Sequence, residues 1–301
     1  LVEAVFGRER RYGRPQTGDA ASLTALTVAD LRRFHDARYT PVGATLVVVG
    51  DVTAEVLPEL EKAFGGWAAP ENTPAAPEVR RPRQVKGRTV WLVDKPGATQ
   101  SAIRLGRVGP SWDDPRYHAG EVMNTLLGGS FTSRLNDNLR EQNGYTYGAG
   151  SALRRHRVGG LFLAAADVQT DKTAPAVTEF FKELERIRTP ATELEVERAR
   201  SYNALGYAEK FETTSQVAGH IVEKVIYGFA DSFFAEYVPK ALAVNPAALQ
   251  AAAKATVDPG KIAVVVVGDR ETVEAPLRAL KLGEVKVKSV DDVMGPAPTI
   301  E

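Results

Sequence analysis

The chain has 301 residues, of which 44% are hydrophobic and 25% charged, and its 38 basic side chains balance its 38 acidic ones. This balance excludes a global electrostatic attraction to nucleic acid or to an anionic membrane. The absence of cysteine excludes disulfides, thiol catalysis and cysteine-ligated metal. The longest apolar runs, residues 161–166 and 262–268, have the length of core strands, whereas a membrane-spanning helix needs about 20 apolar residues. We therefore expect a folded protein with a sizeable core, no nucleic-acid partner and no membrane span.

The first expected element is a helix in the stretch LVEAVFG, residues 1–7. Residue 1 falls inside this helix and is Leu rather than Met, so we expect the chain to be a piece of a longer protein.

Two segments of the chain resemble each other, because residues 26–58 align without a gap on residues 244–276. Each segment starts a short helix at an N-cap residue, Thr27 or Asn245. A proline then ends the helix, and an apolar run with three consecutive valines predicts a buried strand before a second helix. Duplication explains this match better than chance. We expect two αβ units, the first represented only by its final third, and roughly 150 residues upstream of residue 1.

Between the two copies lies a segment with several prolines, which predicts an extended linker. Its basic cluster, Arg80, Arg81, Arg83, Lys86 and Arg88, could contact phosphate, but without interleaved aromatic residues a solvated linker is the better interpretation. The predicted organisation is a C-terminal part of a first domain, a linker, a complete second domain and a tail, at residues 1–68, 69–88, 89–285 and 286–301.

The second domain shows the pattern of a sheet covered by helices. Strands are expected at 89–94, 100–109, 145–154, 159–168 and 261–267, and helices at 115–128, 131–142, 173–188, 192–209, 213–228, 231–243, 246–255 and 271–281. One strand pair is a hairpin, so the sheet should be largely antiparallel. The fold class predicted is α+β, with helices packed on the sheet.

A metal site is not apparent in the sequence. Zinc peptidases pair ligands on one helix face, as in HExxH or HxxEH. The stretches HAGEV, residues 118–122, and HIVEK, residues 220–224, each have a His and a Glu but lack the second His. His35 and His156 are isolated. We expect ordinary histidines and no metal ligand within the chain. Neither a phosphate-binding GxxxxGK[ST] loop nor a GxSxG nucleophile elbow occurs.

The stretch GGSFTSRLNDNLREQNGYTYGAGS, residues 128–151, combines a helix, a stop and a glycine-spaced strand. Arg140 falls in the last helical turn, where the helix dipole favours a cation. Asn143 and Gly144 predict a left-handed stop. Strand alternation then places Tyr147 on one face together with Tyr145 and Ala149, as a half-buried residue. Local structure explains each residue but not the clustering of glycines around them.

At this stretch the sequence resembles the pitrilysin/insulinase family of HxxEH zinc metallopeptidases, in the bacterial processing-peptidase-like branch. The resemblance rests on residues 127–151 together with RYGRPQTGD, residues 11–19, and on residues 26–52. It implies two similar αβ domains that form a clamshell, the first of which carries the zinc ligands. It further implies that Arg140 and Tyr147 reach the zinc site as catalytic residues. An extended, unfolded peptide would bind by adding to a sheet edge.

The chain departs from the family in one respect, since no HxxEH occurs within residues 1–301. The resemblance places the zinc ligands upstream of residue 1, so Glu3 is not a ligand and the chain alone is expected to be inactive. Three interpretations stay open: the C-terminal portion of a zinc metalloendopeptidase, a non-catalytic partner of an HxxEH subunit, and a non-enzymatic structural member. The pair Arg140 and Tyr147 argues against the third. Homodimer, heterodimer, bacterial periplasm and cytoplasm all remain open.

Overall fold

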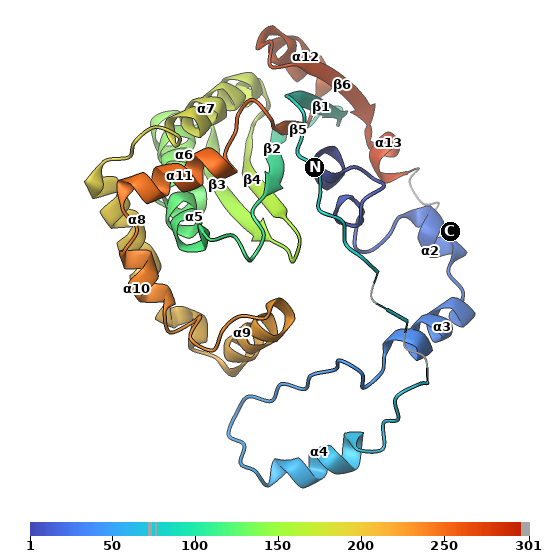
Figure 1. The fold of residues 1–301 in the computed structure, drawn as a ribbon. Coiled ribbons are helices and arrows are strands. Elements are labelled where there is room, and N and C mark those ends of the chain that lie inside the picture. The colour runs from blue at the N-terminus through green and yellow to red at the C-terminus, as the bar shows by residue number, and fades with distance from the viewer. Residues whose placement is uncertain (72–73, 76, 296–301) are drawn as a thin grey trace. The chain divides into compact units, whose positions relative to one another are not determined.

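The computed structural model describes residues 1–71, 74, 75 and 77–295 (Figure 1). The chain divides into two compact units. We call them the sheet unit, residues 1–17, 80–205 and 236–301, and the helical unit, residues 18–79 and 206–235. The predicted division at residues 68, 88 and 285 into domain, linker, domain and tail differs from this one and stays a prediction.

A six-stranded sheet forms the sheet unit, with strand order β3-β4-β2-β5-β1-β6. Its strands are β1 Thr89–Asp94, β2 Gln100–Gly109, β3 Thr146–Arg155, β4 Gly160–Gln169, β5 Ala263–Gly268 and β6 Glu284–Ser289. The pairs β3–β4, β4–β2 and β2–β5 are antiparallel, and β1 runs parallel to both β5 and β6. This mixed, mostly antiparallel sheet with helices confirms the predicted fold class.

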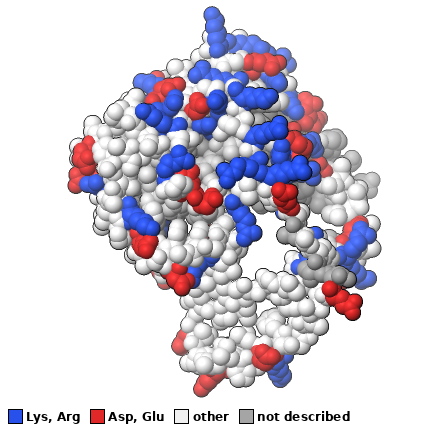
Figure 2. Space-filling model, viewed as in Figure 1, with Lys and Arg blue, Asp and Glu red and all other residues white. Residues whose placement is uncertain are grey.

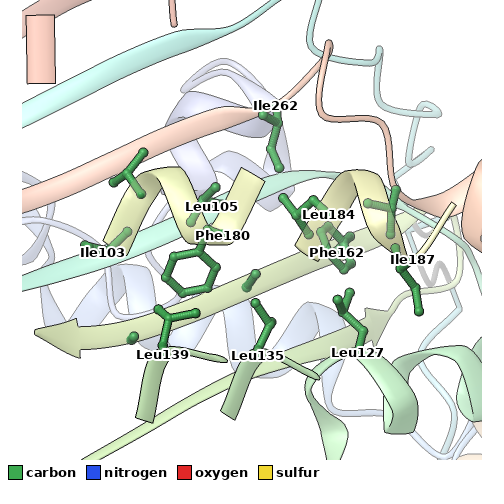
Figure 3. Close-up of a cluster of buried hydrophobic side chains, with 14 of the residues drawn as sticks. Ile103, Leu105, Leu127, Leu135, Leu139, Phe162, Phe180, Leu184, Ile187 and Ile262 are labelled. Carbon is green, nitrogen blue, oxygen red and sulfur yellow. The ribbon is translucent and has the colours of Figure 1, made fainter. Parts of the chain in front are cut away.

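Helices cover one face of this sheet, where the main core lies. They are α5 Tyr117–Asn124, α7 Thr173–Arg186, α8 Glu193–Leu205, α10 Tyr237–Leu242, α11 Pro246–Thr256 and α12 Arg270–Ala279. Figure 3 shows Phe180 and Leu184 of α7 close to Phe162 of β4, and all three side chains are fully buried. Alternation along β4 directs Phe162 toward these helices and Leu161 toward the opposite face.

The opposite face carries the predicted first helix, α1 Val2–Phe6. Its Val5 and Phe6 pack with Leu161 and Ala263 in a smaller cluster. Where α1 lies, the sheet is therefore buried on both faces. This explains why β5 is a continuous valine run rather than an alternating one.

The segment 286–301, predicted as a tail after the second domain, contains regular structure in its described part. Strand β6 and helix α13 Val290–Met294 occupy its described part, and residues 296–301 lie outside the described residues. The sequence EVKVKS alternates charged and apolar residues, as expected of a strand at the sheet edge. Two predicted helices are also shorter than expected, since 192–209 ends at Leu205 and 231–243 starts at Tyr237.

The helical unit contains α2 Ala20–Ala25, α3 Val28–Arg38, α4 Val56–Phe64 and α9 Thr214–Tyr227. Thr27 caps α3 as predicted, in a capping box with Asp30. The strand predicted around the valines 47–49 is wrong, because residues 44–49 form no strand. A strand requires a neighbour for its backbone groups, and the described residues place none beside this run. Figure 2 shows a largely uncharged surface over α4 and the segment before it.

None of the helices among the described residues combines the length and apolar character required to cross a membrane. On the face drawn in Figure 2, basic and acidic side chains are interspersed, in keeping with a formal net charge of zero.

Candidate functional site

The candidate site starts where helix α5 ends. Residues Thr125–Gly129 continue α5 as a π-helical turn, and the chain becomes extended at Ser130. A side chain on Gly128 would collide with the backbone of Ser151 in β3. Glycine at this position therefore lets the end of the helix lie directly against the strand that carries Tyr147.

The helix predicted at 131–142 forms only from Arg134. It consists of α6 Arg134–Asn136 and a π-helical turn over Asp137–Gln142. Leu135 and Leu139 are fully buried in the main core. Such π-helical turns are rare and are frequent at functional sites.

Arg140 lies in this π-helical turn and its guanidinium has two protein contacts. Its carbon Cζ lies 4.5 Å from the centre of the Phe131 ring. Its nitrogen Nη1 donates a hydrogen bond to Oε1 of Glu141, at 2.8 Å. The side chain is about one third exposed, at 33%. Phe131 and Glu141 thus hold the guanidinium plane while leaving other N–H groups open to solvent.

Tyr147 follows the predicted stop, which Gly144 forms with a φ of 65°. The register of β3 against β4 shifts between Thr146 and Ala149. The Thr146 hydroxyl donates to the backbone oxygen of Asp167 and accepts from the Gly148 N–H, which stabilises this bulge. Tyr147 is 93% exposed as a result. The prediction that it is half-buried on the face of Tyr145 is wrong, because a bulge breaks the alternation of side chains.

Arg140 and Tyr147 thus flank one turn, and both reach solvent. Within the described part of the chain, no hydrogen bond or ring contact joins them. The arrangement offers a guanidinium and a phenol O–H to a ligand.

Strand β3 lies at the edge of the sheet, and its outer backbone groups have side-chain partners at two positions. Oδ1 of Asn136 accepts from the Ala149 N–H at 3.2 Å. Nδ2 of Asn124 donates to the Ser151 carbonyl oxygen at 3.2 Å, and its Oδ1 accepts from the Ser151 hydroxyl.

Sequence reasoning missed an ion pair beside Arg140. Nε and Nη2 of Arg134 donate to Oε1 of Glu195 at 3.0 and 2.7 Å, and the Arg134 side chain is only 7% exposed. Burial raises the pKa of Glu195, but hydrogen bonds from Thr192 and Arg134 outweigh this and hold the pKa below its ordinary value. The two residues are 61 positions apart, so no local pattern indicates the pair.

The described residues contain no group of three or more His, Asp or Glu side chains that could hold a metal ion. In HAGEV, Glu121 binds Arg155 at 3.1 Å while His118 packs against Tyr117 and Tyr237. Burial, with Lys240 and Arg155 nearby, lowers the pKa of His118 to about 4. In HIVEK, His220 and Glu223 contact each other at 3.0 Å. Neither stretch presents a set of zinc ligands.

These features define a helix-covered sheet that presents an arginine and a tyrosine from one tight turn, without a metal centre among the described residues. A family model described as the peptidase M16 inactive domain matches residues 25–203. The chain belongs to this family, which confirms the resemblance to the pitrilysin/insulinase zinc metallopeptidases.

Curated relatives carry names that agree with this. An uncharacterized zinc protease of Mycobacterium leprae is 32% identical over 155 residues, which cover 51% of this chain and 34% of the relative. An uncharacterized zinc protease of Streptomyces coelicolor is 32% identical over 167 residues, or 54% of this chain and 36% of the relative. The chain thus spans about a third of the length of these relatives.

Solved structures share the fold. The peptidase M16 inactive domain from Pseudomonas fluorescens superposes with a TM-score of 0.78 at 22% identity, over 89% of this chain and 64% of that one. A protease from Helicobacter pylori gives a TM-score of 0.77 at 22% identity, over 85% of this chain and 62% of that one.

Proposed function

We propose that this chain is the zinc-less portion of a zinc metalloendopeptidase. In this proposal it supplies Arg140 and Tyr147 to a peptide held at a zinc site on another segment or polypeptide. The observation that supports this most is that both side chains, from the two sides of one turn, leave hydrogen-bond donors open to solvent. The name "zinc protease" borne by the curated relatives supports the reaction class.

Within the proposed reaction the two residues act as donors to the peptide carbonyl. In such enzymes zinc supplies an activated water for attack on that carbonyl. The carbonyl oxygen gains negative charge during the attack, and preorganised donors that face it lower the barrier. Tyr147 offers a phenol O–H, and Arg140 offers a permanently charged guanidinium whose plane is already held by Phe131 and Glu141.

The surface of the helical unit supports the proposal that a partner carries the zinc site. Its helices α2, α3, α4 and α9 contain no buried residue. Large apolar side chains are exposed along the first three, namely Leu23, Val28, Leu31, Phe34, Leu57 and Phe64. Exposed apolar surface on this scale marks an interaction site. We propose that a domain or subunit with HxxEH covers it.

Reconstitution tests the proposal. The chain would be co-expressed with an HxxEH polypeptide encoded in the same genome, and cleavage of an internally quenched, unstructured peptide would be followed by fluorescence. We expect cleavage by the complex, no cleavage by the chain alone, and loss of cleavage with a zinc chelator. The HxxEH polypeptide without the chain is the control for an active site complete in itself.

A non-enzymatic role is the competing candidate. A chain of Complex III2 from Candida albicans shares the fold at a TM-score of 0.71 and 18% identity, over 92% of this chain and 68% of that one. The fold therefore also occurs within a larger assembly. A zinc-loaded complex that forms stably yet cleaves no unstructured peptide would favour this candidate over the peptidase.

A further inference from the structure

A pocket of about 560 Å³ lies beside Arg140 in the sheet unit. Its walls come from the segment 125–141 and from helices α7 and α8. The α8 residues Glu195, Arg198, Ala199 and Tyr202 follow helical spacing and share one face of that helix. The volume lies within the range of small-molecule sites, which is about 300–1,000 Å³.

The wall of this pocket is shared with the surroundings of Arg140. Phe131 lines the pocket and also stacks on the Arg140 guanidinium, and Glu141 lines the pocket and also accepts a hydrogen bond from Arg140. An occupant of the pocket would therefore lie next to the candidate catalytic residue, separated from it by these two side chains.

The three carboxylates of the pocket already have partners. Glu195 accepts two hydrogen bonds from Arg134, and Asp137 accepts one from the Gln142 amide at 2.7 Å. Glu141 accepts from Arg140. Since each carboxylate is paired, the pocket has little capacity left to bind a cation.

The arginines are less fully paired. Arg186 lies 3.5 Å from Glu183 and 3.7 Å from Glu195, beyond good hydrogen-bond distance, and half of its side chain is exposed. Arg198 is exposed and makes no ion pair with any residue that the structure describes. Arg134 has one buried terminal nitrogen, Nη1, without a hydrogen-bond partner in the described structure. The available donors are thus guanidinium groups, which match the planar carboxylate.

Exposed aromatic rings complete the pocket. Phe131 is 67% exposed, and Tyr202 also exposes more than half of its surface. With Leu126 and Ala199 they provide apolar surface around the arginines. A charged group on an apolar stem, as at a peptide terminus or an acidic side chain, fits this combination.

We propose that this pocket binds a carboxylate of a peptide, through Arg198 and Arg186, next to Arg140. The inference rests on the proposed function for the nature of the ligand, because a peptidase substrate is what would lie there. The carboxylate is either the C-terminus of the peptide or an Asp or Glu side chain.

Measuring how peptides bind to the 301-residue chain tests the proposed carboxylate site. The measurement needs neither zinc nor peptide cleavage. Fluorescence anisotropy would compare labelled unstructured peptides that differ in one group: a C-terminal carboxylate, a C-terminal amide, and the amide with one internal Asp or Asn. We expect a carboxylate of either source to tighten binding at least about tenfold over its neutral counterpart, which a charge-assisted hydrogen bond can supply. Preference for the C-terminal acid or for Asp identifies the source.

Arg198→Gln should remove this difference and leave the circular dichroism spectrum unchanged, because Arg198 is exposed. Arg154→Gln, which replaces an exposed arginine on β3 outside the pocket, is the matched control and should retain it. Equal binding of acid and amide peptides would overturn the proposal. So would a preference that survives Arg198→Gln combined with Arg186→Gln, or one that inorganic phosphate abolishes at equimolar concentration. If the complex cleaves peptides but shows no carboxylate preference, only the proposed role of the pocket is wrong. If the chain prefers carboxylates but the complex cleaves nothing, only the proposed peptidase function is wrong.

Discussion

Leu31 and Leu249 occupy the same position in the two aligned segments, yet Leu31 is 58% exposed and Leu249 is 0% exposed. Both lie in helices of the same length, which begin after a capping residue, Thr27 for α3 and Asn245 for α11. The difference arises beneath the helices. Leu249 packs into the core on the sheet, whereas the described residues place no sheet under α3.

This contrast predicts unequal effects of one substitution. Leu249→Ala should lower the free energy of unfolding by about 2–5 kcal/mol, because it leaves a cavity in the core. Leu31→Ala should change it by less than about 0.5 kcal/mol in the isolated chain, since an exposed side chain is removed. Urea unfolding of the two variants checks this. A similar loss in both would mean that Leu31 is covered in solution.

The contrast also explains what the sequence could predict of the fold. Capping residues and helical spacing are local, so helices such as α3 and α11 follow from the sequence. The strands β1 and β2 match their predicted ranges because short apolar stretches bounded by turn residues mark them. The valines 47–49 have the same local pattern as β5, but pairing is decided by other strands, and no local signal reports whether those are present.

Tyr147→Phe should leave stability nearly unchanged, because its side chain is exposed and makes no hydrogen bond that the described structure contains. In a reconstituted peptidase complex the same change should lower kcat/KM by about 10²–10³, the usual effect of removing one donor to a developing oxyanion. Arg140→Gln should act in the same direction. Steady-state kinetics with zinc content measured in parallel checks this, and Arg154→Gln, at an exposed arginine elsewhere on β3, is the control. Unaltered kinetics in both variants would remove the catalytic role.

Arg134→Ala should destabilise the chain, because it leaves the Glu195 carboxylate without its partner. We expect a loss of about 2–3 kcal/mol, below the range for fully buried pairs since Glu195 retains some solvent contact. Comparing the stability of the original chain with that of Glu195→Gln shows how the contribution of the Glu195 charge depends on pH. The pKa of Glu195 is lowered in the folded state, so its stabilisation is present above the ordinary value of 4.5 and is lost as the pH falls below it. The stability difference between the original chain and Glu195→Gln should therefore shrink in acid, as chemical unfolding at pH 7 and pH 4 would show.

The lowered pKa of His118 predicts that the chain loses stability in mild acid. Burial lowers its folded pKa to about 4 from an ordinary 6.5. Above pH 6.5 the ring is neutral in both states and contributes nothing. Between pH 6.5 and 4 the unfolded chain binds the proton and the folded chain does not, so the melting temperature should fall as the pH falls. His118→Gln should flatten this decline, whereas His35→Gln, at an exposed position, should not. An unchanged slope in His118→Gln would contradict the assignment.

The site was predictable only in part. Arg140 and Tyr147 follow from the resemblance to the family, and Gly144 forms the stop that its sequence indicates. The exposure of Tyr147 was not predictable, because it depends on a bulge set by the register between two strands. The Phe131 stack and the pair of Arg134 with Glu195 depend on tertiary contacts, which spacing along the chain does not report.

The asparagines beside β3 have a consequence for how the protein meets other chains. An open sheet edge is a template on which any extended segment can pair. Asn136 and Asn124 already occupy the outward N–H of Ala149 and the outward carbonyl of Ser151, so an incoming strand would find these two groups already bonded. A peptide that follows Tyr147 along β3 would have to displace these two amides to form a full ladder of backbone hydrogen bonds at these residues. The same two amides work against self-association through β-sheet pairing at this part of the edge.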